Sequence, residues 1–248
     1  MKKENQETNK VIHLDWDSNF FGIPIGRIYA NGLTGEHLSK RLESAKQENI
    51  KFIELFCDVS DHESVYSSES LDFHLADLRI TLKKNLEEDI KEDRGHKDLI
   101  FKKADRADIN RLKTMSKGLF KDSRYYRYQK FDRNNIDLMF QIWIEKSVPG
   151  EFDDEVYCLY DETDILAFCS LKYKGNTASI GLFGINSAYR GKGLGSLILK
   201  RILHLLYKRR VTDVGVITHG RNSGAVHLYQ KNGFGLAAIT LCYYKWLE

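Results

Sequence analysis

The sequence predicts a mixed α/β fold built in two parts. Strand-like apolar runs alternate with runs at helical spacing along the chain. The chain has 248 residues, of which 42% are hydrophobic, so it can bury a substantial core as one large domain or two modest ones. A charged stretch over residues 83–98 separates two α/β-patterned segments. We therefore expect a smaller N-terminal α/β domain over residues 1–93 and a second domain over residues 94–248.

The first segment is expected to alternate short strands with two helices. Leu38, Leu42 and Ala45 recur at helical spacing after Thr34, a good N-cap residue, and predict a helix over residues 34–49. A turn is expected between the first two strands. The remaining predicted elements are strands over 11–14, 23–29, 51–59 and 75–83 and a helix over 61–71.

The second segment is expected to start with a strand and two helices and to end in a strand-rich half. An irregular stretch of aromatic and basic residues lies between them, over residues 120–131. A stripe of leucine and isoleucine with basic residues beside it predicts an amphipathic helix over residues 194–209. The other predicted elements are strands over 99–103, 155–160, 165–173, 177–185, 212–218 and 239–246 and helices over 106–117, 135–147 and 222–232.

Composition and charge argue against several classes of protein. The net charge is only +3 and no long basic block occurs, so we expect an anionic small molecule rather than a nucleic acid as partner. No apolar run approaches about 18 residues and the N-terminus is polar, so we expect a cytoplasmic protein without a membrane partner. The four cysteines form no C-x-x-C pair, which argues against a metal site and favours buried reduced thiols.

A glycine-rich hexapeptide between a predicted strand and a predicted helix is the strongest functional signal. It reads Arg190, Gly191, Lys192, Gly193, Leu194 and Gly195. Alternating glycines let the backbone approach a ligand, and the helix behind them offers unpaired amides to a diphosphate. Lys192 is followed by glycine rather than serine or threonine, so a P-loop is excluded, and the spacing also lacks the dinucleotide-binding pattern. The alternative is a glycine-rich turn that merely leads into a helix.

A second motif follows about 30 residues later. It runs from Asn222 through Ala225 and Tyr229 to Gly233 and Phe234. Asn222 is a good N-cap and Gly233 a good left-handed C′ residue, so a helix is expected between them, with Asn222, Ala225 and Tyr229 on one face. The alternative is a structural role for both, Tyr229 in the core and Asn222 as a simple cap.

Together the two motifs resemble the GCN5-related N-acetyltransferase (GNAT) family. The resemblance implies a central mixed, mostly antiparallel sheet flanked by helices, and the first segment is compatible with a partial copy of that fold. It implies acetyl-CoA as co-substrate, held by the glycine loop, by Asn222 and Ala225, and by the strand residues Phe183, Gly184 and Ile185. A backbone amide of that strand would stabilise the oxyanion, and Tyr229 would protonate the leaving thiolate as general acid.

A weaker resemblance narrows the acceptor. The segment Trp16-Asp17-Ser18-Asn19-Phe20-Phe21-Gly22 is similar to a signature of the dTDP-fucosamine acetyltransferase family, which acetylates the 4-amino group of a dTDP-linked 4-amino-4,6-dideoxy sugar. By this resemblance we expect a nucleotide-linked amino sugar as substrate and a place in polysaccharide biosynthesis. Arg124, Tyr125 and Tyr126 are the candidate substrate-binding residues, since they offer ring faces and a guanidinium fork. They could equally pack on the core.

Several alternatives stay open from the sequence. The acceptor could instead be a peptide N-terminus, a polyamine or an antibiotic amine, and the fold could serve as a non-catalytic acyl-CoA-binding module. No motif identifies a general base, for which His219, Glu54 and Glu145 are all conceivable. A homodimer is compatible with the sequence.

Overall fold

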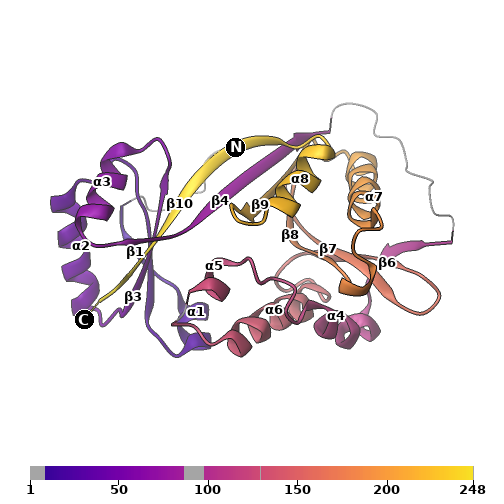
Figure 1. Cartoon of the computed structure of the whole chain (residues 1–248), viewed down its shortest axis with the longest axis horizontal. Helices are drawn as coiled ribbons and strands as arrows, with labels where there is room; N and C mark the ends of the chain where they lie inside the picture. The colour runs from indigo at the N-terminus through magenta and orange to yellow at the C-terminus, as the bar shows by residue number, and fades with distance from the viewer. Residues whose placement is uncertain (1–8, 87–97, 129, 248) are drawn as a thin grey trace. The chain divides into compact units, whose positions relative to one another are not determined.

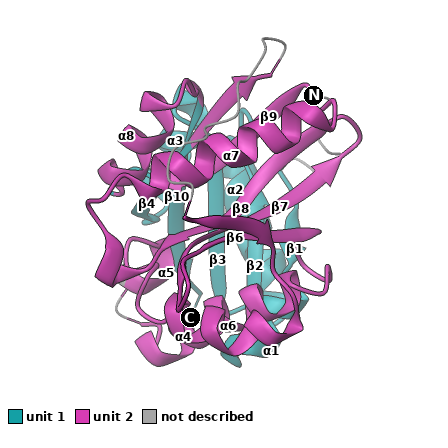
Figure 2. Ribbon diagram, turned by 90° about the vertical axis from the view of Figure 1, so that its right-hand side faces the viewer, with its two compact units in different colours: residues 1–80, 219–221, 238–248 teal, residues 81–218, 222–237 magenta. Residues whose placement is uncertain are grey.

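The computed structural model describes residues 9–86, 98–128 and 130–247 (Figure 1). The chain divides into two compact units (Figure 2). Unit 1 comprises residues 1–80, 219–221 and 238–248, and unit 2 comprises residues 81–218 and 222–237. The expected boundary near residue 93 lies outside the described residues and stays a prediction.

Unit 1 is an α/β layer with a mixed sheet. Its helices are α1 (Asp15–Phe21), α2 (Gly35–Gln47) and α3 (His62–Ser70). Its strands are β1 (Val11–His13), β2 (Ile25–Tyr29), β3 (Phe52–Asp58), the first part of β4 (His74–Asn85) and most of β10 (Gly235–Trp246). β2 pairs with β1 antiparallel and with β3 parallel, and β10 pairs with β3 antiparallel.

The core of unit 1 lies between its sheet and α2. Leu38 and Leu42 of α2 pack with Ile53 and Leu55 of β3 in one buried cluster. Thr34 caps this helix, because its Oγ1 accepts a hydrogen bond of 3.3 Å from the His37 amide. The expected helix and its N-cap are therefore confirmed. Continuous burial of β3 agrees with a strand covered on both faces.

The turn expected near residues 15–22 is instead the short helix α1. The ring of Trp16 stacks on that of Phe20, one helical turn later, with centroids 5.1 Å apart. Gly22 ends the helix in the left-handed conformation, at φ 66°. The expectation was wrong because five aromatic and acidic residues in seven do not show helical periodicity over so short a span.

Unit 2 is a second α/β layer in which strands β9-β8-β7-β6-β5 are neighbours in that order. β5 to β8 pair antiparallel and β9 joins β8 in parallel. Helix α7 packs against the β6–β8 region, and α4 packs against α6. The elements are β5 (Ile100–Lys103), a 3₁₀ turn (Arg106–Asp108), α4 (Ile109–Ser116), α5 (Arg124–Arg127), α6 (Arg133–Ser147), β6 (Glu155–Tyr160), β7 (Ile165–Lys174), β8 (Thr177–Ile185), a second 3₁₀ turn (Ser187–Tyr189), α7 (Leu194–Lys208), β9 (Asp213–His219) and α8 (Ser223–Lys231).

These elements confirm the predicted mixed α/β class. The stretch over residues 120–131 contains one helical turn, α5, which Ser123 caps by accepting from the Tyr126 amide at 3.3 Å. Within the described residues, no helix is both long and apolar enough to cross a bilayer. The same residues contain no group of three or more histidine, cysteine or acidic side chains that could hold a metal ion.

Candidate active site

The glycine loop leads directly into helix α7. Gly191 and Gly193 have φ angles of 78° and 77°, in the left-handed region that other residues rarely adopt. A Cβ at either position would meet nothing within 4 Å. Conformation rather than crowding therefore demands glycine here, and the loop leaves open space beside its backbone.

The first turn of α7 presents amides without intrahelical partners. Gly193 is its N-cap and offers no side chain, and the amide of Leu197 makes a hydrogen bond of 3.2 Å to the Gly193 carbonyl. The amides of Leu194, Gly195 and Ser196 come before that bond and have no acceptor within the helix. With the positive end of the helix dipole added, this terminus suits an anion such as a diphosphate.

The third glycine of the loop has a different task. A Cβ at Gly195 would lie 3.3 Å from both terminal methyl carbons of Leu228, so glycine allows α8 to approach α7 closely. Asn232, at the end of α8, donates to Ser196 Oγ at 3.2 Å and to the Leu228 carbonyl at 2.8 Å. Sequence reasoning gave Asn232 no role, because its partner on α7 is 36 residues away.

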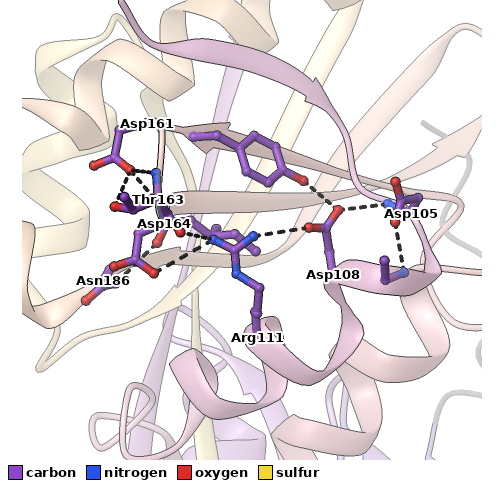
Figure 3. Close-up of polar contacts among 10 residues, drawn as sticks. Asp105, Asp108, Arg111, Asp161, Thr163, Asp164 and Asn186 are labelled. Atoms are coloured by element: carbon purple, nitrogen blue, oxygen red, sulfur yellow. Dashed lines mark hydrogen bonds and ion pairs between the residues drawn. The ribbon is translucent and has the colours of Figure 1, made fainter.

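A polar network anchors the chain just before the loop (Figure 3). Arg111 of α4 donates to the Thr163 carbonyl in the β6–β7 turn at 2.8 Å. Asn186, at the end of β8, donates to the Ile165 carbonyl at 3.2 Å and accepts from the Ala188 amide at 3.2 Å. These bonds fix the 3₁₀ turn that precedes Arg190, so the loop starts from a held position.

Strands β8 and β9 are paired along only part of their length. Their parallel register runs from Thr177 opposite Asp213 to Ile180 opposite Val216 and ends there. Further along, the Asn186 amide donates to the Leu166 carbonyl of β7 at 2.9 Å. Because amides alternate in direction along a strand, those of Phe183 and Ile185 face away from β7, on the side where the pairing with β9 has ended.

Tyr229 of α8 lies buried beside this part of β8. Its side chain is 3% exposed, and its ring centroid lies 5.9 Å from that of Phe183 and 5.4 Å from that of Phe234. Burial, with a smaller contribution from Cys169, raises the pKa of Tyr229 well above its usual value. The phenol therefore stays protonated and can act as a proton donor, not as a base.

Asn222 caps α8 as expected. Its Oδ1 accepts a hydrogen bond of 3.1 Å from the Ala225 amide. The Ala225 amide is therefore used within the cap, so Ala225 can meet a cofactor only through its methyl group or carbonyl. This capping bond uses Oδ1 of Asn222. The hydrogens that the side chain can donate are on its nitrogen, Nδ2.

Comparison with known proteins decides the type of this domain. Residues 119–234 match the family described as acetyltransferase (GNAT) family. This span contains the glycine loop, strands β8 and β9, and Tyr229. Residues 119–234 form a GNAT acetyltransferase domain. The prediction of a GNAT acetyltransferase is thus confirmed at the level of the family, and acetyl-CoA is the co-substrate that this family uses.

The similar proteins extend this result. Mycothiol acetyltransferase from Corynebacterium glutamicum (strain R) is 32% identical over 94 residues, which are 38% of this chain and 32% of that protein. The chain thus matches about a third of the length of that curated relative. A GCN5-related N-acetyltransferase from Sphaerobacter thermophilus has a TM-score of 0.69 at 12% identity, covering 95% of this chain and 76% of that one.

A third similar protein is a tandem GNAT protein from the clavulanic acid biosynthesis pathway. Its structure has a TM-score of 0.63 at 10% identity and covers 91% of this chain and 76% of that one. Both structural likenesses show the GNAT fold. A partial second copy of the fold in the N-terminal segment is compatible with them and stays a prediction.

The candidate substrate residues of the GNAT domain differ in accessibility. Tyr125 is 4% exposed, and its ring packs edge-on against Phe131 with centroids 5.3 Å apart. Arg124 donates to the Tyr125 hydroxyl at 2.8 Å and lies over its ring. Tyr125 is therefore placed for packing, whereas Arg124 and Tyr126 are partly exposed.

The two carboxylates considered as general bases are both ion-paired. Glu54 is fully buried and lies 2.5 Å from Arg27. Glu145 lies 2.6 Å from Lys113. Both carboxylates thus have a cationic partner within the protein.

His219, the last residue of β9, belongs to unit 1, as does its partner Asp77. Its Nδ1 forms a short contact with the carboxylate of Asp77, which is buried. The same carboxylate lies 3.6 Å from Arg221 Nε. Asp77 thus orients the His219 ring, as carboxylates do for histidines in many enzymes and in many structural clusters alike.

Proposed function

We propose that this chain is an acetyl-CoA-dependent N-acetyltransferase that acts by direct transfer on the amino group of a nucleotide-linked amino-deoxy sugar. One observation carries the transfer part of the proposal. Within unit 2, three features belong to elements that pack on one another: the N-terminus of α7, the end of β8 beyond its pairing with β9, and the buried phenol of Tyr229. These three features meet three separate needs of acyl transfer.

The loop and helix α7 would hold the pyrophosphate of acetyl-CoA. Amides of Gly193, Leu194 and Gly195 would donate to its oxygens, and the open space beside Gly191 and Gly193 leaves room for them. Arg190 and Lys192 add positive charge at the loop. Asn222 Nδ2 would donate to an amide carbonyl of the pantetheine arm.

Acetyl-CoA supplies an acetyl group activated as a thioester. The amide of Phe183 or Ile185 would donate to the thioester carbonyl oxygen and stabilise the negative charge that develops there, an interaction worth about 10²–10³ in rate per donor in other enzymes. The neutral amine of the acceptor would form the new C–N bond as the C–S bond breaks, and Tyr229 would give its proton to the leaving sulfur. The proton that the amine loses would pass to water. General acid help of this kind contributes about 10²–10⁴ in rate.

The nucleotide-sugar acceptor is supported by the residues and not by the comparisons. Arg124 and Tyr126, partly exposed beside the N-terminus of α6, offer a guanidinium and a ring for a phosphate and a sugar or base. The segment from Trp16 to Gly22 resembles a signature of enzymes that act on such substrates. A second candidate acceptor follows from the curated relative, whose name assigns it to mycothiol.

A substrate screen tests the proposal. Purified protein with acetyl-CoA is offered dTDP- and UDP-linked 4-amino sugars, the acceptor of mycothiol acetyltransferase, a polyamine and a peptide with a free N-terminus, and release of free thiol is recorded. We expect turnover with a nucleotide-linked amino sugar and an N-acetylated product by mass spectrometry. Turnover only with another class would refute the acceptor but keep the transfer chemistry. Absence of acetyl-CoA binding would refute both.

A further inference from the structure

Strand β8 contains an irregularity just before the residues assigned to the reacting carbonyl. Leu171 of β7 lies opposite Ile180, whereas Cys169 lies opposite Phe183. Two residues of β8, Gly181 and Leu182, therefore face the single residue between them on β7, which is Ser170. This is a β-bulge with the extra residue on β8.

The extra residue decides which amides of β8 point toward β9. The Asn186 amide bonds to the Leu166 carbonyl, so Leu166 and Phe168 present their polar groups to β8. A regular continuation from Ile180 opposite Leu171 would place Phe183 opposite Phe168 and would turn the Phe183 and Ile185 amides toward β7. The bulge shifts the register by one residue and so turns those two amides the other way.

A hydroxyl holds the bulge in place. The Leu182 amide, inside the bulge, donates to Ser170 Oγ at 2.6 Å. Ser170 is fully buried, where an amide without an acceptor would cost about 1–3 kcal/mol. The Ser170 hydroxyl donates in turn to Asp153 Oδ2 at 2.5 Å. Its proton is thereby committed, which leaves its lone pairs for Leu182.

Helix α6 holds the Asp153 carboxylate through a hydrogen bond. It is 4% exposed, and Trp143 of α6 donates to its Oδ2 at 3.0 Å. Its carboxylate lies against Gly181, where a Cβ would overlap it. A glycine in the bulge, a hydroxyl on β7 and a buried carboxylate thus form one connected unit, which we call the bulge lock (Asp153, Ser170, Gly181 and Leu182).

We propose that Ser170 and Asp153 are positioning residues for acyl transfer, which hold the β8 bulge so that the Phe183 and Ile185 amides meet the thioester carbonyl. The inference rests on the proposed function of this site. Neither residue contacts the acetyl group. Each acts through the direction of the main-chain amides, and loss of the lock lets β8 relax toward regular pairing with β7.

Unit 2 also offers a matched control outside the lock. Ser116 of α4 is fully buried as well, and its hydroxyl donates to the Lys113 carbonyl at 2.9 Å. Ser116→Ala therefore removes a buried hydroxyl from the same unit without changing a bond of Asp153 or of β8. Ser170→Ala removes the acceptor of the bulge amide, and Ser170→Cys fills the same space with a weak acceptor.

The experiment measures the carbonyl directly and needs no acceptor substrate. Acetyl-CoA labelled with ¹³C at the carbonyl is bound to each full-length variant, its dissociation constant is measured by calorimetry, and its carbonyl stretch is recorded by infrared difference spectroscopy. In the wild type we expect a stretch at lower frequency than in solution. Ser170→Ala should lose at least half of that shift while its dissociation constant stays within about threefold, and Ser170→Cys should be intermediate. In a separate assay with the acceptor found in the substrate screen, Ser170→Ala should lower turnover about 10- to 100-fold, which does not exceed the loss of one oxyanion donor.

Ser116→Ala should keep the wild-type frequency even if its thermal stability falls as much as that of Ser170→Ala. An unchanged frequency in Ser170→Ala and Ser170→Cys would overturn the positioning role while leaving the proposed function intact. Equal loss in Ser116→Ala would also overturn it, since the effect would then be general destabilisation. A wild type that does not bind acetyl-CoA would overturn the proposed function and this inference with it.

Discussion

Replacing Tyr229 with phenylalanine removes one hydroxyl beside the end of β8 that no longer pairs with β9, and changes little else. In water, a phenol at pKa about 10 gives its proton to a thiolate at about 8.5 at a cost of about 2 kcal/mol. Burial raises the pKa of Tyr229 above its ordinary value, and the same dry surroundings raise that of a thiol, so the difference between them stays tolerable. We expect kcat to fall about 10²- to 10⁴-fold in Tyr229→Phe, the range of general acid catalysis.

Binding and folding should change far less than turnover. The loop amides are untouched, so the dissociation constant of acetyl-CoA should stay within about twofold by calorimetry. Because the raised pKa keeps the phenol protonated, kcat should not fall between pH 8 and pH 10 through this residue. Tyr207→Phe, on the same unit but about 20 Å along α7 from the loop, is the control and should keep full turnover. Unchanged kcat in Tyr229→Phe would remove this residue from the proton-donor role.

Three further variants test other parts of the account. Gly193→Ala forces alanine to φ 77° and should weaken acetyl-CoA at least tenfold by calorimetry, whereas Gly175→Ala, at φ 59° in open space, should cost similar stability and leave affinity unchanged. Gly184→Ala would place its Cβ 2.5 Å from Leu119 and Phe168 side-chain atoms, so its melting temperature and its kcat should both fall, and a variant equal to wild type in both would contradict the packing described. Burial alone would raise the pKa of Glu155, but hydrogen bonds, led by that from Arg209, lower it to about 2. The Glu155 carboxylate therefore stabilises the fold above pH 4.5, and this contribution is lost as the pH falls toward 2. Glu155→Gln should therefore flatten the unfolding free energy between pH 4.5 and 2 in urea titrations, and an unaltered slope would count against the network.

Local signals were sufficient for the helix caps and the glycine loop. Thr34 and Asn222 cap their helices through partners three residues away, so the sequence alone carries the information. Gly191 and Gly193 adopt the left-handed conformation that alternating glycines indicate. These features depend on a few neighbouring residues, which is why spacing predicts them.

Contacts between distant segments were beyond such reasoning. Ser170 lies 17 residues from Asp153, and serine in a strand gives no sign that its hydroxyl serves a bulge on the next strand. Tyr125 is buried by packing that includes Phe131. Residue type alone does not show this packing, so the sequence predicted the whole aromatic and basic stretch as a ligand surface. Unit 1 also includes most of β10, a strand near the C-terminus that pairs with β3, with Cys242 opposite Phe56. Sequence spacing does not indicate that so distant a segment completes the first unit.

The most direct test of the account is amide NMR during titration with coenzyme A. If main-chain nitrogens at the start of α7 bind the pyrophosphate, the amide signals of Gly193, Leu194 and Gly195 should show the largest shifts, with a micromolar dissociation constant. Pantetheine, which lacks the pyrophosphate, should leave those three signals in place. Signals that do not move with coenzyme A, or that move only at millimolar concentration, would contradict the central claim.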